Sequence, residues 1–433
     1  MQSGIKALGE NRRGGQTNAI APDSCYKIGI ETKRCEFFSK NAFILDYNHN
    51  ANIAFIISGS FHKQEAGYGR KSYDVDEGNA YGALLFETEF SKRHSLSTGY
   101  NFMHDDLKQD FKLRHAADVS QKANEVENTH GIYAQYTFNH HEKIVVVAGI
   151  RGDYSNKFGG FITPRMNVKW NPSQVFSLRL SAGKGYRSPH ALAENNYLLA
   201  SSRNIYVADD LKQEKAWNFG ASTMFNIKVH EKDLSINLDY YYTHFLNQTI
   251  IDLDANPHGV SFYNLDGKAF SHTFQIDATY PFFDEFSITA AFRVNYVKSS
   301  YHGTLREQPL TSRYKGLLTA TYKTPLELWQ FDVTCQLNGG GRMPDPYRTE
   351  DGELSWNHRY KAFPQLSAQV TRIFKWGSIY IGGENLTNFK QDKPIIDSGD
   401  PWSDNFDATL IWGPIDGAMA YIGARIKLTK NDK

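Results

Sequence analysis

The side chains best suited to bind a ligand lie in a polar stretch near the C-terminus, residues 389–416. Trp402 and Phe406 supply aromatic rings that could stack on a planar or sugar-like molecule. The polar groups beside them, which could hold the polar atoms of that molecule, are Asp400, Asp404 and Asn405. The alternative is that these residues form an ordinary solvated loop.

A second candidate set begins at Arg187, within the long polar link of residues 187–213. Arg187 lies on the face of its predicted strand that carries polar and small residues, and Glu194 and Asn195 follow within the link. A guanidinium, a carboxylate and an amide are groups that bind the polar atoms of a ligand. We therefore treat them as candidate binding residues, with wall electrostatics and solvated loop residues as the alternative.

The sequence contains little evidence of a metal site or an enzyme active site. Four aspartates gather in the last polar stretch: Asp397, Asp400, Asp404 and Asp407. Carboxylates are calcium ligands, but the run D-S-G-D-P-W-S-D lacks the spacing of an EF-hand loop. His140, His141 and Glu142 are adjacent, and neighbours on a strand point apart instead of converging on a metal. Because no nucleophile elbow, zinc-protease motif or nucleotide-binding glycine pattern is present either, we predict no metal, no cofactor and no enzymatic activity.

The elements that position these residues are predicted to be long β-strands with apolar and polar side chains in alternation. The stretch 234–246 is an example. One of its faces holds Leu234, Ile236, Leu238 and Tyr240, and the other holds Asn237, Asp239 and Tyr241. Several such runs continue for about 12–20 residues, which corresponds to about 40–65 Å at the rise of a strand. Strands of that length cross a bilayer and are too long for a soluble sandwich.

The links between these runs alternate between short and long. Short links are expected near residues 47–52, 90–94, 139–143, 171–174, 229–233, 282–285, 325–326 and 375–377. Long links are expected near residues 65–78, 105–128, 156–161, 187–213, 252–259, 299–309, 339–359 and 389–416. This alternation is typical of a transmembrane barrel, which has tight turns at one end and long loops at the other. Ligand selectivity would then lie in the long links, above all 187–213, 339–359 and 389–416.

Composition narrows the class further. Lys plus Arg number 48 and Asp plus Glu 47, so the chain lacks the basic surplus of a nucleic-acid-binding protein. Mean hydropathy is −0.53, aromatic residues make up 14%, and no apolar run is long enough for a membrane helix. We predict an all-β fold, a transmembrane antiparallel up-and-down β-barrel with about 17 strands. The three cysteines are interpreted as incidental, with a Cys25–Cys35 disulfide as the alternative.

Several motifs carry a resemblance to a known family. They are GIRGDY (149–154), FITPR (161–165), RLSAGKGYRSPHALAENN (179–196), GGENLTNFKQDKPII (382–396), WSDNFDATLIWGP (402–414) and GAMAYIGARIKL (417–428). Together they resemble the TonB-dependent outer-membrane receptors, in particular the Bacteroidetes branch. Residues before 149 match the family more loosely.

The resemblance implies a partial receptor barrel over residues 1–433, with about 17 of the 22 strands of such barrels and no plug domain or signal peptide. Unpaired sheet edges are then expected near residues 35–45 and 418–428. The implied location is the cell outer membrane, and the implied partners are its lipid and the TonB complex, reached through a plug that this chain lacks. The implied cargo is a scarce, bulky nutrient such as an iron chelate, cobalamin or a glycan. A passive porin-like channel and a soluble all-β glycan-binding protein are the alternatives.

Overall fold

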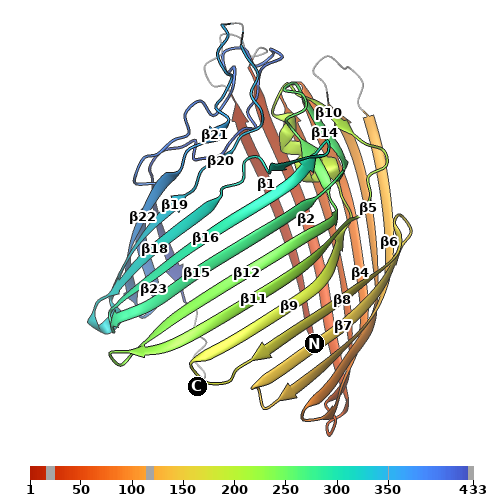
Figure 1. Ribbon diagram of the computed structural model, residues 1–433, viewed down its shortest axis with the longest axis vertical. Helices are drawn as coiled ribbons and strands as arrows, with labels where there is room; N and C mark the ends of the chain where they lie inside the picture. The colour runs from red at the N-terminus through yellow and green to blue at the C-terminus, as the bar shows by residue number, and fades with distance from the viewer. Residues whose placement is uncertain (16–24, 114–120, 350, 428–433) are drawn as a thin grey trace.

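The computed structural model describes residues 1–15, 25–113, 121–349 and 351–427, and long antiparallel strands dominate it (Figure 1). The wall strands are β1 (Gln2–Gly15), β2 (Lys27–Asp46), β3 (Ala51–Tyr68), β4 (Lys71–Ser91), β5 (His94–Lys112), β6 (Gln121–His140), β7 (Ile144–Ser155), β8 (Gly159–Trp170), β9 (Phe176–Arg187), β11 (Glu214–Val229), β12 (Lys232–Asn247), β15 (Ala269–Phe283), β16 (Phe286–Tyr301), β17 (Thr304–Glu307), β18 (Tyr314–Lys323), β19 (Trp329–Asn338), β22 (Phe363–Phe374), β23 (Gly377–Glu384) and β24 (Met419–Ile426). Short strands in the connections are β10 (Asn204–Val207), β13 (Thr249–Asp252), β14 (Gly259–Asn264), β20 (Gly341–Arg342) and β21 (Arg359–Tyr360). The helical pieces are α1 (Ala191–Asn195) and the 3-10 turns η2 (Asn196–Leu199) and η3 (Pro325–Glu327).

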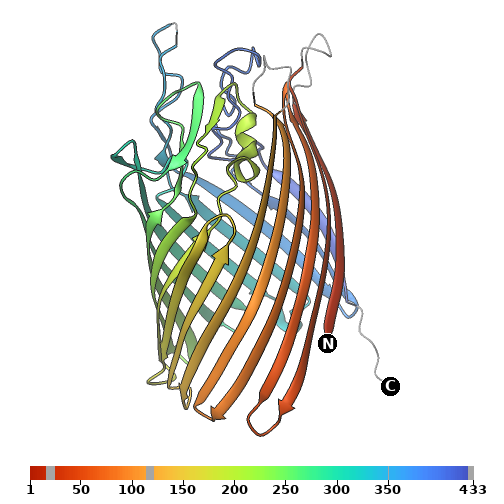
Figure 2. The same ribbon diagram turned by 90° about the vertical axis from the view of Figure 1, so that its right-hand side faces the viewer.

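Among the described residues, the wall is one sheet of 19 strands in up-and-down order. Successive wall strands pair antiparallel, from β1 with β2 through β9 with β11 to β23 with β24, except that β16 pairs with both the short β17 and β18. The sheet curves around an open interior, with long loops at one end and hairpin turns at the other (Figures 1 and 2). The predicted all-β, antiparallel barrel architecture is confirmed, and the predicted count of about 17 strands falls just short of the 19 observed.

The two edges of the sheet are β1 and β24. Among the described residues, β1 forms a ladder only with β2, and β24 only with β23. The prediction of an unpaired sheet edge near residues 35–45 is therefore wrong, because β1 pairs with β2 along the whole length of β1. The run GIKALGENRRGG in β1 is rich in glycine and charge and lacks the alternation that signals a strand. Its side chains are almost all exposed, so backbone pairing rather than burial holds it in place.

The predicted short links are confirmed as the hairpin turns at one end of the wall (Figure 2). The turn between β11 and β12 shows the local reason. His230 and Glu231, its two central residues, have φ of 46° and 67°. Two left-handed residues give a turn whose twist matches that of the flanking strands. Such turns are short, and the long loops lie at the other end of the wall.

Four predicted long links are mainly strand or turn instead, and one of them, 299–309, is the hairpin of β16 and β17. Residues 65–78 belong to β3 and β4, which meet in a two-residue turn at Gly69 and Arg70. Most of 105–128 extends β5 and β6, and its residues 114–120 lie outside the described ranges. The link at 156–161 shrinks to the three residues before β8. Polar residues form strands here because they continue the backbone ladders of the neighbouring strands, and Lys63 opposite Asp76 is one favourable charge pair among them.

Side chains alternate between the two faces of the wall as predicted. Asn237, Asp239 and Tyr241 line a hollow on the concave face, and Tyr240, between them, is 42% exposed on the other face. Trp170 and Phe282 lie near the turn end and are also exposed. An apolar outer face, a polar inner face and rings near the strand ends are the pattern of a barrel in lipid. None of the helices in the described part of the chain is long and apolar enough to cross a membrane.

Candidate functional site

Two of the predicted binding loops pair with each other above the lumen. Residues 187–213 meet residues 389–416 in an antiparallel bridge between Ser201 and Asp407. The amide of Ala408 donates to the carbonyl of Ala200 at 3.0 Å, and the amide of Ser202 donates to that of Phe406 at 2.8 Å. Segments two hundred residues apart in sequence are therefore joined by backbone hydrogen bonds, which fixes them as one unit.

A buried ion pair stands at the centre of this junction. Nε of Arg203 lies 2.8 Å from a carboxylate oxygen of Asp407, and both side chains are almost fully buried. From the start of β4, the ammonium of Lys71 donates to the carbonyls of Ser201 and Arg203, at 2.6 and 2.8 Å. Burial lowers the pKa of Lys71 to about 8, although the nearby Asp407 carboxylate opposes the shift. One carboxylate thus compensates two buried cations, and the junction depends on it.

The third predicted loop, residues 339–359, joins the same assembly through an apolar contact. Met343, Tyr360 and Leu410 form a buried cluster, and the ring of Tyr360 stacks on Trp412 at 5.1 Å. The guanidinium of Arg203 lies 5.9 Å from the Trp356 ring. The structure therefore brings all three predicted loops together at one end of the barrel, in the residues it describes.

A hydrophobic core attaches this assembly to the wall. Leu192, Leu198 and Leu199 of α1 and η2 pack with Tyr73 of β4 and Leu107 of β5, among other buried residues. Figure 2 shows the helical segment inside the mouth, against the long strands. Burying such side chains stabilises the contact by about 1.5–3 kcal/mol each. The loop is consequently a packed element of the mouth.

Three of the predicted site residues are engaged with their own loop. Arg187 forms ion pairs with Glu194 at 2.7 Å and with Glu214 at 2.6 Å. The amide group of Asn195 donates to the carbonyl of Ala191 at 2.9 Å. These contacts shape the start of the loop. Their role in binding stays a prediction.

The predicted aromatic pair shares one neighbour. The ring of Phe406 is 4% exposed and lies 4.6 Å from that of Tyr26. Trp402 lies 5.8 Å from the same ring and carries the Arg70 guanidinium 4.2 Å above it. Phe406 is thus a core residue of the loop in this structure.

The remaining predicted residues surround this pair. Asp400 accepts a hydrogen bond from the amide of Trp402 at 3.1 Å. The backbone carbonyl of Asp404 accepts one from His258 Nδ1 at 2.9 Å, and the Asn405 side chain is exposed. Asp400 therefore orders the loop locally, and the side chains of Asp404 and Asn405 face solvent at the mouth.

Under the loops lies a cavity of about 700 Å³. Its wall side is formed by β1, β2 and β3, and its roof by η2 and residues 310 and 408–411. Tyr68 donates to the side-chain oxygen of Asn196 at 2.8 Å across this lining, and Tyr197 leaves its ring 49% exposed. Sequence reasoning missed these residues, because Tyr68 was assigned to a loop and nothing in the sequence showed that η2 folds back over β3.

A cluster of charged groups holds the start of the first loop. His190 lies 3.7 Å from a carboxylate oxygen of Glu125 and 3.9 Å from one of Asp105, and Lys157 pairs with Glu125 at 2.5 Å. The contact with His190, together with Lys157, lowers the pKa of Glu125 to about 2. The same contact raises the pKa of His190. Charge attraction thus docks the loop on the inner faces of β5 and β6.

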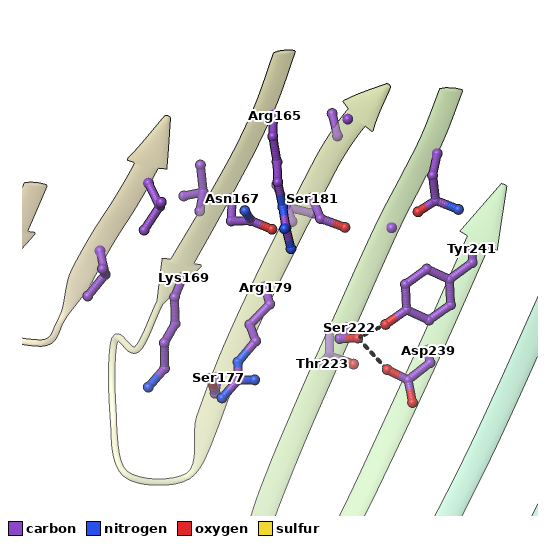
Figure 3. A pocket seen from close by; sticks show the side chains of 18 of the residues that line it. Arg165, Asn167, Lys169, Ser177, Arg179, Ser181, Ser222, Thr223, Asp239 and Tyr241 are labelled. Atoms are coloured by element: carbon purple, nitrogen blue, oxygen red, sulfur yellow. Dashed lines mark hydrogen bonds between the residues drawn. The ribbon is translucent and has the colours of Figure 1, made fainter. Parts of the chain in front are cut away.

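A second hollow, of about 890 Å³, opens on the lumen face of the wall (Figure 3). Figure 3 looks onto β8, β9, β11 and β12 from the inside and shows Arg165, Lys169 and Arg179 projecting into the hollow. Asp239 and Tyr241 line its other side.

The described residues include no group of three or more His, Cys, Asp or Glu side chains placed to hold a metal ion. Cys35 and Cys335 are free and exposed, so no Cys25–Cys35 disulfide forms.

An amphipathic barrel wall, a polar lumen and a mouth roofed by packed loops define a membrane β-barrel with its long loops gathered at one end. Comparison with known proteins gives its family. The family described as "TonB dependent receptor-like, beta-barrel" matches residues 30–386, and the chain belongs to it. The match includes the motifs from GIRGDY to ENL and also residues 30–148, where the resemblance was looser. Because the family consists of outer-membrane receptors and transporters, the chain is not an enzyme.

Solved structures share the fold at low identity. A copper transporter, OprC, has a TM-score of 0.66 and 13% identity, and the match covers 90% of this chain and 68% of that protein. The siderophore receptor PiuA from Acinetobacter baumannii has a TM-score of 0.61 and 12% identity, over 92% and 64% of the two chains. The ferric citrate transporter FecA has a TM-score of 0.61 and 13% identity, over 92% and 62%. The chain therefore spans about two thirds of their length. No curated protein matches the sequence.

Proposed function

We propose that the chain forms the barrel of an outer-membrane transporter that binds a bulky nutrient at its loop-lined mouth and takes it up with energy from TonB. The observation that carries the proposal is the convergence of three long loops at the mouth, two of which, 187–213 and 389–416, line a cavity of about 700 Å³. That volume lies in the range of small-molecule binding sites. Family membership supports the transport role.

The proposed cargo is a scarce, bulky nutrient, and among iron chelates, cobalamin and glycans we favour a metal chelate. The structural neighbours named above are described as transporting copper or ferric citrate or as binding siderophores. In the cavity, the exposed ring of Tyr197 and the amide of Asn196 are the groups we expect to contact the chelator.

The proposed partners are the lipid of the outer membrane, at the apolar outer face of the wall, and the TonB complex. The strands and loops of this chain account for about two thirds of the length of the solved transporters. We propose that coupling to TonB acts through a plug domain that accompanies this barrel. The proposal assigns cargo recognition to the loops and lumen of the present chain, and energy coupling to the plug.

The test is a binding titration on the purified protein in detergent, followed by intrinsic tryptophan fluorescence. The panel contains ferric citrate, a ferric catecholate siderophore, cobalamin and a neutral oligosaccharide. We expect a metal chelate to bind, and Tyr197→Ala to weaken it about tenfold, or about 1.4 kcal/mol. Tyr47→Ala is the matched control, because Tyr47 is 80% exposed at a hairpin turn. The proposal fails if no panel member binds, or if Tyr197→Ala and Tyr47→Ala behave alike.

A further inference from the structure

Three cations stand together on the inner wall, two of them close to the hairpin turns and the third, Arg165, midway along its strand. Arg165 and Lys169 come from β8, and Arg179 comes from β9. All three line the lumen hollow of about 890 Å³ (Figure 3). Lys169 and Arg179 also line an adjoining hollow of about 530 Å³ next to the turns. The two hollows therefore share a cationic border.

This group of cations lacks compensation within the described ranges. Lys169 lies directly opposite Arg179 in the β8–β9 register. None of the three cations forms an ion pair with a carboxylate of the described chain at 4.0 Å or less. Like charges directly opposite each other destabilise a sheet. An anion in the hollow would relieve this repulsion and bind to both side chains at once.

The acids of the hollow lie on other strands and already have partners. Asp239 of β12 accepts a hydrogen bond from Ser222, and Asp277 of β15 accepts one from Asn237 at 2.8 Å. In the adjoining hollow the one lining carboxylate is Glu142, in the turn that precedes β7. The β8–β9 side is therefore cationic and the β12–β15 side acidic, with β11 between them.

The rest of the cationic side suits an anion as well. Asn167 and Ser181 add neutral donor groups between the charges, and neither is engaged in a side-chain hydrogen bond among the described residues. Gly183 lies opposite Arg165, and a Cβ there would come within 3.4 Å of the arginine stem. The absence of that Cβ leaves room for the guanidinium. Arginine presents a planar fork of donors that matches the geometry of a carboxylate or phosphate.

We propose that Arg165, Lys169 and Arg179 form an oxyanion-binding surface on the lumen wall, which takes carboxylate or phosphate groups. We further propose that the bound carboxylate or phosphate belongs to the cargo, so that the cargo is an anionic chelate. This second step rests on the proposed function. Placed near the turn end, the surface would receive an anion after it leaves the mouth. The same chemistry could instead be met by acidic side chains of a polypeptide in the lumen.

The test is isothermal titration of the purified full chain with citrate, pyrophosphate and a hexaglutamate peptide at low salt. We expect at least one of these probes to bind, and Lys169→Gln with Arg179→Gln to weaken that binding by about tenfold or more. Lys323→Gln is the control, because it removes a cation near the same end of the barrel but outside both hollows. In the wild type, Lys323 pairs with Glu327 at 3.6 Å. Binding should also weaken as salt rises, because salt screens the attraction.

Each outcome decides a point. Citrate or pyrophosphate binding that is lost in the double variant supports a soluble anionic group, whereas binding of the peptide alone identifies acidic side chains as the source. If the double variant binds as the control does, or if no probe binds to the folded wild type, the surface is refuted. Arg179→Lys guards against misfolding, because it keeps the charge and should retain most of the binding. Failure here leaves binding at the mouth, tested by Tyr197→Ala, unaffected.

Discussion

The two sides of the barrel reach its loop end by different means. On the N-terminal side, β2 to β6 run for 18 to 21 residues each and rise as paired strands well beyond the others (Figure 2). On the C-terminal side, β18, β19, β22, β23 and β24 run for 8 to 12 residues, and long loops join β19 to β22 and β23 to β24. We refer to these as the tall wall and the short wall. The connections between β9 and β11 and between β12 and β15 pack on the tall wall, whose inner face contributes Tyr73 and Leu107 to the core that holds them.

The difference shows that polar sequence does not distinguish strand from loop above the membrane. In the tall wall, polar residues continue the strand ladders. Some of them face opposite charges, as Asp76 faces Lys63 and Lys108, and others face like charges, as Lys63 faces Lys33. In the last loop, Pro401, Gly399 and Gly413 interrupt any such ladder. Backbone pairing with a neighbouring strand, which proline and glycine disfavour, therefore separates the two structures.

The largest expected effect concerns the two sheet edges, because β1 borders the tall wall and β24 ends the short wall. In lipid, each unpaired backbone group costs several kcal/mol. The chain alone should therefore not form a compact, detergent-stable monomer unless β1 and β24 find partners. A semi-native gel checks this. A heat-modifiable monomer band would contradict it, and a band at twice the mass would show that edges pair between copies.

The next effect tests the ion pair that joins the loop between β9 and β11 to the last loop of the short wall. Asp407→Ala leaves Arg203 and Lys71 buried without their carboxylate. We expect a loss of about 3–5 kcal/mol in the local stability of the junction, measured by hydrogen exchange of the amides of Ser202 and Ala408. Asp404→Ala is the matched control, because that side chain is exposed in the same loop. Equal exchange in the two variants would show that the junction does not depend on the pair.

A comparable or smaller effect is expected in the core between the first loop and the tall wall. Leu199 is fully buried there, and Leu199→Ala should destabilise the docked loop by about 2–5 kcal/mol. Leu326→Ala changes the same side chain where it is 86% exposed, at a hairpin turn, and should have almost no effect. Limited proteolysis within residues 187–213 reports the result. Unchanged cleavage in Leu199→Ala would mean that the tall wall does not hold the loop.

How far the sequence predicts this molecule differs between its regions. Alternation and turn residues predicted the wall, its hairpin turns and the three loops of the mouth, because these signals are local. The strand at Gln2–Gly15 and the hairpin at Gly69 were missed, since their stability comes from partners across the sheet. The Arg203–Asp407 pair and the cavity beside Tyr68 could not be predicted from the sequence for the same reason. Each of them joins segments more than a hundred residues apart.

The smallest expected effect is a pH dependence in how the first loop docks on the tall wall. His190 contacts Glu125 and Asp105, and the charges that face it include Lys157, which opposes its protonation. Because its pKa is raised in the folded state, His190 contributes stability that is fully present below its unfolded pKa of about 6.5. That stability is lost as the pH rises through the folded pKa.

Glu125 acts in the opposite direction. Its pKa is lowered to about 2, so its contribution is present above the unfolded value and is lost as the pH falls towards 2. Docking should therefore be strongest between about pH 4.5 and 6.5, and it should weaken by about 0.5–1 kcal/mol at pH 8, the scale of a partly exposed ion pair. Hydrogen exchange of the Glu194 amide, corrected for the intrinsic pH dependence of exchange, measures this change. His190→Gln should remove the pH dependence above pH 6 while leaving the Leu199 core in place, and a dependence that persists in this variant would assign it to another group.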